Sequence, residues 1–468
     1  MRTIAIVGGG ISGLALGEAL QHRARTSGQP IRTVIFEEGP AIGGKISTIV
    51  EDGFVIETGP HGFLDRDPLI HEVIARLGLT ARVRKANEAA SNRYIVRGGK
   101  LRQLPASPPA FLASDVLPLL AKLRVLLEPF IGRNRSGQDE SVWSFAARRL
   151  GPAAADVLVD AMVTGIYGGD PKRLSVAAAF PALAALEQQY GSLIRGQIAK
   201  SKEQKRLGAG GGEGAAMGGP RGSLHSFDKG LGVLIHALAE KLEVRTQAPV
   251  RGLARDGARW KVTADGAEPL EADAVVLTVP TFEMLRLLRP LAGTAADPLD
   301  GVMYPPVAVV VQAFDRAAMP RTYDGFGFLA PNIEGRGVLG SIWASTVFPD
   351  HAPSDTVMMR TLLGGVRHPE RAEADPETLL ERSTLELRGL LGLADRPQVR
   401  AKRVIRWERA IPQYDLGHSA RIAAADGLEQ AYPGLYLSGN GLRGVAMVQC
   451  VTASDALASR IFASEPHN

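Results

Sequence analysis

The sequence predicts an α/β protein, and three observations carry this prediction. The N-terminus has the pattern of strand, glycine-rich turn, helix and strand, from "TIAIV" to "RTVIFEE" within residues 3–38. The C-terminus ends with a strand "GLYLSG", a second glycine-rich turn and a helix "ASDALASRIF". Between them, residues 105–200 have helical periodicity, and strands resume after residue 242. A long helical insert therefore interrupts an α/β framework whose two ends are alike.

Composition limits the classes of function that suit this chain. A length of 468 residues fits about three domain-sized units, and an apolar content of 45% supports large buried cores. The net charge of +5 is spread without runs of like charge, so no nucleic-acid partner is expected. An anionic membrane surface or a carboxylate-bearing small molecule suits that charge. The one cysteine, Cys450, excludes an internal disulfide and is expected to be a buried apolar residue.

Two apolar segments bear on localisation. The first, "TIAIV", is five residues long and stops at glycines, so it is no secretory signal and we expect a cytoplasmic protein. The second, Val116 to Ile131, has 16 residues with three charges and two prolines. A spanning helix needs about 20 predominantly apolar residues. The second segment is therefore not expected to cross a membrane, although it suits a position on a membrane surface.

The first glycine-rich turn has the spacing of a dinucleotide-binding site. Gly8, Gly10 and Gly13 form G-x-G-x-x-G between a strand and a helix, which is the context that this pattern requires. The glycines allow a tight turn, close approach of a pyrophosphate, and close packing of the helix on the strand. Glu37 ends the next strand, where a carboxylate accepts hydrogen bonds from ribose hydroxyls and repels a 2'-phosphate. A Rossmann-like domain that binds a dinucleotide other than NADP is therefore predicted.

The glycine triplet alone does not distinguish NAD from FAD. Further glycines help to make this distinction. Gly43 and Gly44 follow the acidic strand end, and "ETGPHGF" follows at Glu57 to Phe63. Both segments offer backbone that a long flavin nucleotide can approach, with ordinary turns as the alternative. "SKEQKRLGAGGGEGAAMGGPRG", residues 201–222, has eight glycines but no apolar strand before it, so we expect a surface loop there.

Nine motifs along the chain together resemble those of a known enzyme family. "VGGGISGL", the glycine pair, "ETGPHGFL", "NRYIVRGGKLRQLP", "DAMVTGIYGGDPKRLS", "SFDKGLGVLI", "DGFGFLAP", "IPQYDLGH" and "GNGLRGVAMVQC" follow one another along nearly the whole chain. In this order they resemble the protoporphyrinogen oxidases and the related coproporphyrinogen oxidases that use FAD. The resemblance implies three parts. These are an FAD-binding domain from residues 1–90, 228–285 and 400–468, a substrate-binding domain from 91–105 and 286–399, and a helical membrane-associated domain from 106–227.

The resemblance also implies site residues. The last strand-to-helix turn would place backbone N–H groups near the pyrimidine end of the flavin, residues 45 and 59–62 would line the isoalloxazine, and the backbone of Val250 would meet the adenine. The predicted cofactor-binding residues are Gly8, Gly9, Gly10, Ile11, Ser12, Gly13, Glu37, Glu38, Gly43, Gly44, Lys45, Gly59, Pro60, His61, Gly62, Val250, Asn440, Val445, Ala446 and Met447.

For the substrate, Arg93 matches the arginine that the family offers to a propionate, because an arginine fork suits a carboxylate in an apolar cleft. A surface position for Arg93 is the alternative. The other residues match positions on either side of the macrocycle, and without the resemblance they would be assigned to the core. These are Met162, Gly165, Phe326, Gly327, Phe328, Leu329 and Leu362.

The implied reaction is oxygen-dependent oxidation of protoporphyrinogen IX to protoporphyrin IX in haem biosynthesis, six electrons in three flavin cycles with peroxide formed. Coproporphyrinogen III is the alternative substrate, and another flavin oxidase or a non-catalytic flavin- or porphyrin-binding protein is the alternative function. No triad, paired carboxylates or metal-ligand pattern is visible, so neither a catalytic side chain nor a metal is predicted.

Three positions depart from the family pattern. Val448-Gln449 stands where Asn-Asp is common, Ala41 replaces a basic residue, and His61 is unusual at its position. The first two departures bear on how the flavin is bound, and the third bears on the choice of substrate.

The expected partners follow from a hydrophobic product. We expect a peripheral position on the inner face of the cell membrane, where Val116 to Ile131, helped by Lys122 and Arg124, faces an anionic surface. A buried core helix is the alternative. The next haem-pathway enzyme is a further expected partner, and a homodimer is left open.

Overall fold

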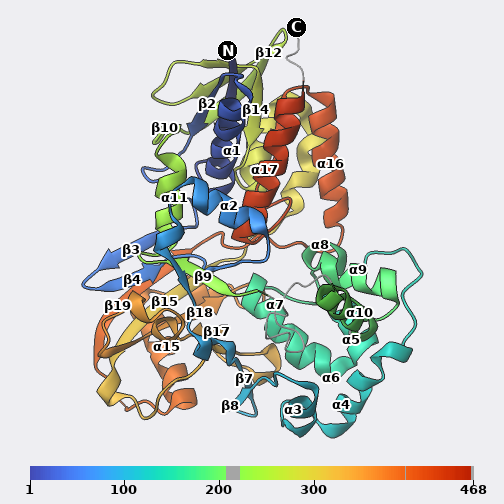
Figure 1. Cartoon of the computed structure of the whole chain (residues 1–468), viewed down its shortest axis with the longest axis vertical. Helices are drawn as coiled ribbons and strands as arrows, with labels where there is room; N and C mark the ends of the chain where they lie inside the picture. The colour runs from blue at the N-terminus through green and yellow to red at the C-terminus, as the bar shows by residue number, and fades with distance from the viewer. Residues whose placement is uncertain (207–221, 396, 465–468) are drawn as a thin grey trace. The chain divides into compact units, whose positions relative to one another are not determined.

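The computed structural model describes residues 1–206, 222–395 and 397–464 (Figure 1). The chain divides into two compact units. Unit 1 contains Met1–Lys85, Ser223–Met303 and Ser419–Asn468, and unit 2 contains Ala86–Gly222 and Tyr304–His418. The three-domain division of the sequence, including a separate helical domain, stays a prediction.

A five-stranded parallel sheet forms the centre of unit 1. Its order is β10 (Glu243–Arg245), β2 (Ile31–Phe36), β1 (Arg2–Val7), β14 (Ala274–Leu277) and β20 (Leu435–Leu437). Because β20 comes from the C-terminal part of the chain, the two ends of the chain share one sheet.

The sheet of unit 1 is covered on both faces, so its three central strands, β2, β1 and β14, are almost completely buried. Ile4 and Ile6 of β1 pack in one core with α1 (Ile11–Ser27), α2 (Pro68–Arg76), α11 (Gly232–Ala239) and α17 (Met447–Ala463). Ala5 and Val7 pack in a second core with α12 (Thr281–Ala292), α16 (His418–Ala431) and a small antiparallel sheet. That sheet consists of β11 (Val250–Asp256), β12 (Arg259–Ala264) and β13 (Leu270–Ala272).

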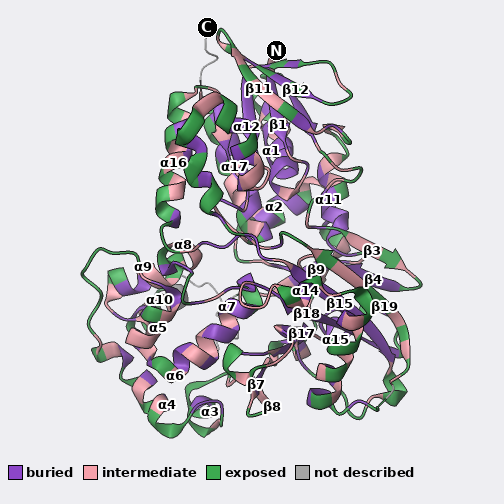
Figure 2. Cartoon of the chain, turned by 180° about the vertical axis from the view of Figure 1, so that it is seen from behind, coloured by how far each residue is buried: buried purple, intermediate pink, exposed green. Residues whose placement is uncertain are grey.

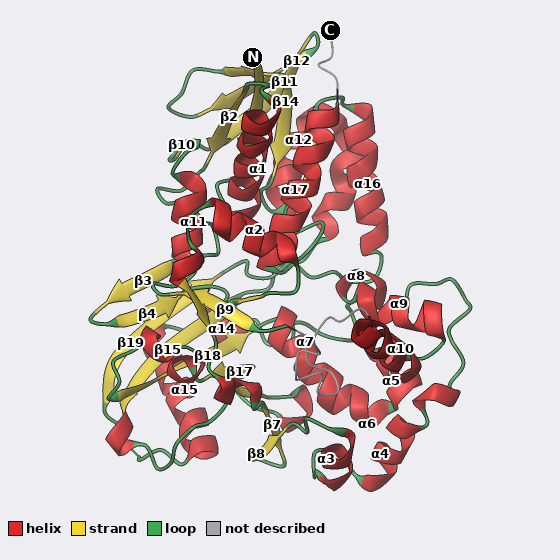
Figure 3. Ribbon diagram, viewed as in Figure 1, coloured by secondary structure: helices red, strands yellow, loops and turns green. Residues whose placement is uncertain are grey.

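Two further small sheets complete unit 1 (Figure 3). One is the hairpin of β3 (Thr48–Glu51) and β4 (Phe54–Glu57). The other has the order β5 (Phe63–Leu64), β9 (Leu224–Phe227) and β6 (Val83–Lys85). Residues 58–62, which carry the predicted flavin-facing glycines Gly59 and Gly62, therefore lie between β4 and β5.

A seven-stranded mixed sheet forms one part of unit 2. Its order is β19 (Val399–Trp407), β15 (Val307–Asp315), β18 (Thr356–Gly364), β17 (Gly340–Ile342), β16 (Gly327–Leu329), β7 (Tyr94–Arg97) and β8 (Lys100–Gln103). The predicted hairpin at residues 93–104 is β7 and β8, with Gly98 and Gly99 at positive φ in its turn. One face of the sheet packs on α15 (Pro376–Leu391).

Short helices form the other part of unit 2, where the sequence predicts them. They are α3 (Pro108–Ala113), α4 (Leu119–Leu126), α5 (Val142–Leu150), α6 (Pro152–Ala154), a π-helical turn (Ala155–Val159), α7 (Asp160–Tyr167), α8 (Val176–Ala179), α9 (Pro181–Tyr190) and α10 (Leu193–Arg206). Two short helices, α13 (Ala344–Val347) and α14 (Glu370–Glu373), adjoin the sheet. Because α10 continues to Arg206, the prediction of a loop from residue 201 is wrong for its first six residues, and residues 207–221 of it lie outside the described chain.

The expected roles of Lys122 and Arg124 are wrong. The Lys122 ammonium is buried and donates to the carbonyls of Leu112 and Ser114, at the C-terminal end of α3. The Arg124 guanidinium donates to the carbonyls of Arg148 and Arg149, at the end of α5. Both cations therefore stabilise helix C-termini inside unit 2.

Seven large apolar residues around α4 are exposed instead, and Figure 2 colours much of this helix as exposed. They are Leu112, Leu119, Leu120, Leu123, Leu126, Leu127 and Phe130. Within the described residues, no helix combines the length and apolar character that crossing a membrane requires.

Candidate functional site

The first glycine turn connects the end of β1 to the start of α1. Gly8 has a φ of 112°, a value that L side chains rarely adopt. A Cβ on Gly13 would lie 2.0 Å from the carbonyl oxygen of Gly8, so only glycine lets the helix pack this close to the strand. A Cβ on Gly10, in contrast, would meet no atom nearer than 4.0 Å, the carbonyl oxygen of Gly43. Open space therefore borders Gly10, where the sequence predicts a pyrophosphate.

The start of α1 suits an anion. Its N-cap residue, Gly10, provides no side-chain cap, and its first turn contains no acidic residue. The backbone N–H of Leu14 donates to the carbonyl of Gly10 at 3.0 Å, so the amides of residues 11–13 precede the first intrahelical bond. Together with the positive end of the helix dipole, these amides favour a negatively charged group at this turn.

Glu37 follows β2, and its carboxylate lies against the first glycine turn. One oxygen accepts the N–H of Gly9 at 2.8 Å, and the other accepts the N–H of Gly39 at 2.8 Å. A carboxylate has about four acceptor positions, so about two remain for the ribose hydroxyls predicted here. The neighbouring Glu38 is exposed.

Two backbone hydrogen bonds of Glu37 hold the segment of residues 245–250 beside it. The N–H of Glu37 donates to the carbonyl of Arg245 at 2.8 Å, and its own carbonyl accepts the N–H of Ala248 at 2.9 Å. Val250, predicted to meet the adenine, lies two residues further on and is buried. Its carbonyl oxygen accepts a hydrogen bond of 2.9 Å from Arg286, which leaves this oxygen one further lone pair.

The second glycine pair packs against the first turn. The N–H of Gly43 donates to the carbonyl of Gly9 at 2.8 Å, and Gly43 forms a parallel β-bridge with Gly10. The φ values of Gly43 and Gly44 are 103° and 59°. A Cβ on Gly44 would have the Cα of Gly10 as its nearest neighbour, at 3.6 Å. The structure thus brings together two glycine segments that the sequence predicts along one ligand.

Close backbone approach continues through the "GPHG" segment at residues 59–62. A Cβ on Gly59 would lie 1.9 Å from the carbonyl oxygen of Lys45, and one on Gly62 would lie 2.7 Å from that of His225. Burial lowers the pKa of Lys45 to about 8. Pro60 is half-buried and His61 is buried in this segment.

The C-terminal turn between β20 and α17 has two glycines at positive φ, Gly439 and Gly444. Asn440 and Val445 are half-buried, and Met447 begins α17. The N–H of Ala446 donates to Gln449 Oε1 at 3.1 Å. Of the four amides predicted to face the flavin, those of Asn440, Val445, Ala446 and Met447, that of Ala446 is therefore already paired, so its donation to a cofactor requires Gln449 to move.

Sequence reasoning missed Thr278, which lies between the two glycine turns. This residue follows β14, and its hydroxyl donates to the carbonyls of Val7 at 2.9 Å and Gly8 at 3.1 Å. A Cβ on Gly13 would lie 2.9 Å from that hydroxyl, and one on Gly439 would lie 3.0 Å from the Thr278 carbonyl oxygen. The position after an apolar strand "AVVL" was the available signal, because parallel strands end at a common edge.

In unit 2, Leu329 and Leu362 lie on one face of the seven-stranded sheet. Each pairs with Gly340, from β16 and β18 respectively, and directly opposed residues share a face. A Cβ on Gly340 would lie 3.1 Å from a Leu329 methyl group, so this glycine keeps the space between the leucines open. Gly340 was missed because nothing in its local sequence reveals its cross-strand partners.

Phe328 does not belong to the predicted site. Alternation along β16 directs its side chain to the opposite face from Leu329, and it is buried in the core under α15. Gly327 has a φ of 135°, and a Cβ there would lie 2.0 Å from the Ser341 carbonyl oxygen. Gly327 therefore allows β16 and β17 to pair closely.

Arg93 lies immediately before β7, and Phe326 immediately before β16. The guanidinium carbon of Arg93 lies 5.7 Å from the centre of the Phe326 ring, and the two segments are joined by the bond from the Phe326 N–H to the Asn92 carbonyl at 2.8 Å. Burial lowers the pKa of Arg93. In the described part of the chain, no carboxylate forms an ion pair with Arg93, so this cation is available to an anionic ligand.

The helix α7 contributes Met162 and Gly165. A Cβ on Gly165 would lie 3.0 Å from both terminal methyl groups of Leu329, so α7 and β16 are in close contact. Met162, Gly165 and Ile166 share one face of the helix and are partly or fully exposed, Ile166 to 38%. Ile166 was not predicted, and its i+4 spacing from Met162 is the signal that identifies it.

Comparison with known proteins decides the family. The chain matches the model described as "Flavin containing amine oxidoreductase" over residues 11–461. Protoporphyrinogen oxidase 1 of Spinacia oleracea is 30% identical over 478 residues, which cover 97% of this chain and 83% of that protein. The chain belongs to the flavin containing amine oxidoreductases, in the protoporphyrinogen oxidase family.

Two further proteins are similar to this chain over nearly its full length. Coproporphyrinogen III oxidase of Bacillus subtilis (strain 168) is 26% identical, with 97% of both chains covered. A crystal structure of a protein from Exiguobacterium sp. 255-15 has a TM-score of 0.81 at 26% identity, with 98% of both chains covered. The α/β fold and the resemblance predicted from the motifs are thereby confirmed.

Family membership makes this chain a flavoenzyme with FAD as cofactor, as predicted. The residues of unit 1 fit that group, because the open space at Gly10, the uncapped start of α1 and the remaining acceptor positions of Glu37 are what phosphates and ribose require. Cys450 is buried behind the C-terminal turn, and burial raises the pKa of its thiol to about 11. It is therefore a packing residue, as expected. Among the described residues, no cluster of His, Cys, Asp and Glu could hold a metal.

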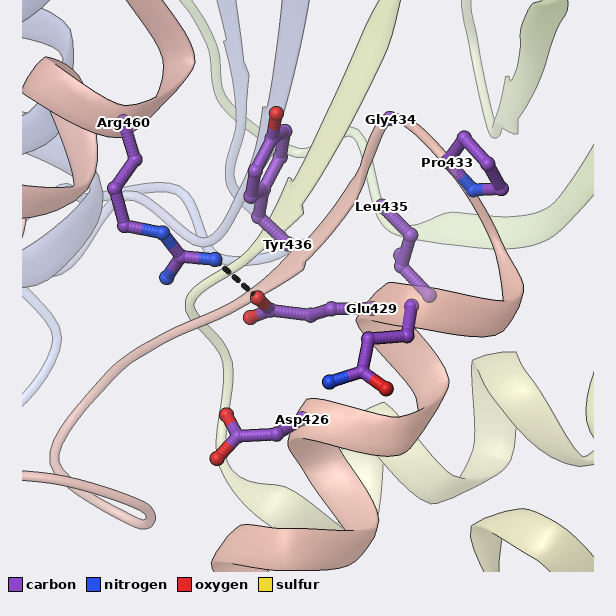
Figure 4. A pocket seen from close by; sticks show the side chains of 8 residues that line it. Asp426, Glu429, Pro433, Gly434, Leu435, Tyr436 and Arg460 are labelled. Atoms are coloured by element: carbon purple, nitrogen blue, oxygen red, sulfur yellow. Dashed lines mark hydrogen bonds and ion pairs between the residues drawn. The ribbon is translucent and has the colours of Figure 1, made fainter. Parts of the chain in front are cut away.

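One separate pocket of 430 Å³ lies beside the start of β20 (Figure 4). It is lined by residues of α16, β20 and α17, including Asp426, Glu429, Tyr436 and Arg460. Glu429 pairs with Arg460 at 2.6 Å, and Asp426 pairs with Arg443. Since these charges satisfy one another, we assign this pocket no ligand.

Proposed function

We propose that this protein oxidises protoporphyrinogen IX to protoporphyrin IX in haem biosynthesis, with O2 as electron acceptor. The substrate loses six hydrogens while three O2 become three hydrogen peroxide molecules. Bound FAD supplies two-electron oxidation, so the reaction takes three cycles. The relative from Spinacia oleracea, named a protoporphyrinogen oxidase, and the arrangement of Leu329, Gly340 and Leu362 support this proposal.

The arrangement in unit 2 is the observation that carries the proposal. Leu329 and Leu362 present methyl groups on one sheet face with a glycine between them, which suits contact with a flat apolar ring system. Arg93 provides a half-buried cation with a fork that matches a propionate carboxylate. In this proposal the chain binds and orients the macrocycle and excludes water, and no side chain is assigned as a base.

The predicted site residues become part of the same proposal. The residues of unit 1 named above hold the cofactor, and Arg93, Met162, Gly165, Phe326, Gly327, Leu329 and Leu362 form the substrate-binding set, with Gly327 acting through strand pairing. Gly340 and Ile166 join this set on the geometry described above.

Coproporphyrinogen III is the second candidate substrate, because the Bacillus subtilis relative with that name matches 97% of both chains. Anaerobic mixing with each porphyrinogen separates the two. We expect loss of oxidised-flavin absorbance with protoporphyrinogen IX, followed by porphyrin fluorescence once O2 is admitted. Faster flavin reduction by coproporphyrinogen III would exchange the order of the candidates. A flavin that stays oxidised with both would refute the proposed function.

We also propose a cytoplasmic protein that binds peripherally to the inner face of the membrane through the apolar surface of α3, α4 and residues 127–130. Leu120 and Phe130 are 80% and 78% exposed there. Since Lys122 is buried, apolar contact rather than cationic attraction supplies most of the binding.

Vesicle flotation tests this membrane proposal. Leu120→Glu should abolish flotation, whereas Leu385→Glu, at a residue 66% exposed on α15, should leave it intact. Equal flotation of both variants, or loss of binding in high salt alone, would contradict apolar docking. Transfer of the product to the next haem-pathway enzyme at this surface, and a homodimer, are further proposals. Co-flotation with that enzyme and sedimentation of the holoenzyme test them.

A further inference from the structure

A short segment that begins with the last residue of β18 holds α7 against the sheet of unit 2. This segment, residues 364–367 with the sequence "GGVR", is called the strap. The N–H of Gly365 donates to the carbonyl of Pro306 at 2.8 Å, and the N–H of Val366 donates to the carbonyl of Gly168, just after α7, at 2.8 Å. A Cβ on Gly365 would lie 2.4 Å from that Gly168 oxygen, so glycine is required for the contact.

The last strap residue, Arg367, binds the other end of α7. Its guanidinium pairs with the carboxylate of Asp160, the first residue of α7, and donates to Thr164 Oγ1 at 2.9 Å. The Asp160 carboxylate also accepts the backbone N–H of Asn332 at 2.8 Å. Asp160 is 6% exposed and Arg367 is 18% exposed in their side chains. The ion pair is therefore largely shielded from water and connects α7, the strap and the loop that follows β16.

The helical turn before Asp160 affects which residues of α7 face the strap and which stay exposed. Residues 155–159 form a π-helical turn directly before α7, and π turns change the direction in which the following residues face. Asp160 and Thr164 are one helical turn apart and both meet Arg367, while Met162, Gly165 and Ile166 remain partly or fully exposed. The helix thus has one face bound by the strap and another available to a ligand.

We infer that the Asp160–Arg367 pair is a positioning pair that fixes α7 against Leu329, and hence sets where Met162 and Ile166 of α7 lie beside a flat tetrapyrrole on the Leu329–Leu362 sheet face. This inference rests on the proposed function. Its geometric basis is that Leu329 touches Gly165, while Asn332, three residues after Leu329, binds the same carboxylate that Arg367 binds. Loss of the pair releases the N-terminal end of α7 from both the strap and that loop.

The test compares two arginine variants of the holoenzyme in unit 2. Arg367→Met removes the positioning pair, and Arg336→Met is the matched control. Arg336 is similarly shielded, 25% exposed, and pairs with Glu386 of α15, which packs on the other face of the sheet. We expect Arg367→Met to raise KM for the porphyrinogen about 10-fold, because the displaced helix loses contact with the bound ring, and a tenfold change in affinity corresponds to a loss of about 1.4 kcal/mol. Flavin content and kcat at saturating substrate should change far less.

Two additional measurements separate positioning from folding. Amide hydrogen exchange in residues 160–168 should be faster in Arg367→Met than in the control, and Arg367→Lys should recover part of the KM, since lysine keeps the charge but not the fork. Equal KM values for an active wild type, Arg367→Met and Arg336→Met would overturn the inference alone. A wild type that oxidises neither porphyrinogen would refute the proposed function, and the inference with it.

Discussion

Gly10 offers a way to separate cofactor binding from folding. A Cβ at this position would meet no protein atom nearer than 4.0 Å, and the φ of Gly10 is −77°, which alanine adopts without strain. The change Gly10→Ala should therefore alter the stability of the apoprotein by less than about 1 kcal/mol, since the smaller entropy of the unfolded chain and the poorer N-cap oppose each other.

Binding of FAD should respond differently to Gly10→Ala. If the pyrophosphate occupies the open space beside Gly10, the added methyl group displaces it from the amides of the α1 N-terminus. The loss of one charge-assisted hydrogen bond, about 1.5–3 kcal/mol, corresponds to a Kd about 10- to 150-fold higher. Titration of the apoprotein with FAD, followed by flavin fluorescence, measures this value, and thermal unfolding of the apoprotein measures stability.

Two control variants separate an effect on FAD binding from an effect on folding. Gly252→Ala, in β11, adds a methyl group that also meets no atom within 4 Å, and it should leave both the FAD Kd and stability near the wild type. Gly13→Ala should destabilise even the apoprotein, because its methyl group would lie 2.0 Å from the Gly8 carbonyl oxygen. Wild-type FAD affinity in Gly10→Ala would refute the placement of the pyrophosphate at this turn.

Three other predictions concern single residues. Arg93→Met should raise KM for the porphyrinogen about 10- to 100-fold with kcat little changed, because a carboxylate loses its cation; an unchanged KM in steady-state assays would exclude that contact. Gln449→Ala should lower the FAD Kd by freeing the Ala446 N–H, and a higher Kd would show that Gln449 supports the turn instead. Burial lowers the pKa of Lys45 from 10.5 to about 8, so the unfolded chain binds more protons between these values and stability rises with pH there. Chemical denaturation should show this rise in the apoprotein and a smaller one in Lys45→Met.

The cofactor side of the site is largely visible in the sequence because its elements are local. Gly8, Gly10 and Gly13 stand between one strand and one helix, and the reasons for glycine at these positions act within a few residues. The likeness of the two glycine-rich turns is visible in the sequence, but the pairing of β14 with β20 in one sheet was not predicted. Thr278 was missed because its role depends on strands β1 and β20, which lie far from it in sequence.

The predictions that were wrong concern the direction in which side chains point, which the sequence pattern does not determine. An apolar run such as residues 116–131 predicts a helix, but not which of its cations turn inward, and Lys122 is buried because α3 ends beside it. Phe328 looked like a ring for the substrate, yet strand alternation sends it to the face that α15 covers. Gly340 and Arg367 act through partners on other strands and helices, so their roles appear only when the topology is known.

The position of β20 has a consequence for biosynthesis. The first glycine turn is complete at Gly13, but the neighbouring turn begins at Gly439, which is 426 residues later. At about 5–20 residues per second, the ribosome needs roughly 20–85 s to cover that interval. Throughout this time the newly made βαβ unit has neither the last strand of its sheet nor the α17 helix that packs on α1. If the C-terminal turn holds the flavin as proposed, capture of the nucleotide comes only after translation has reached the end of the fold.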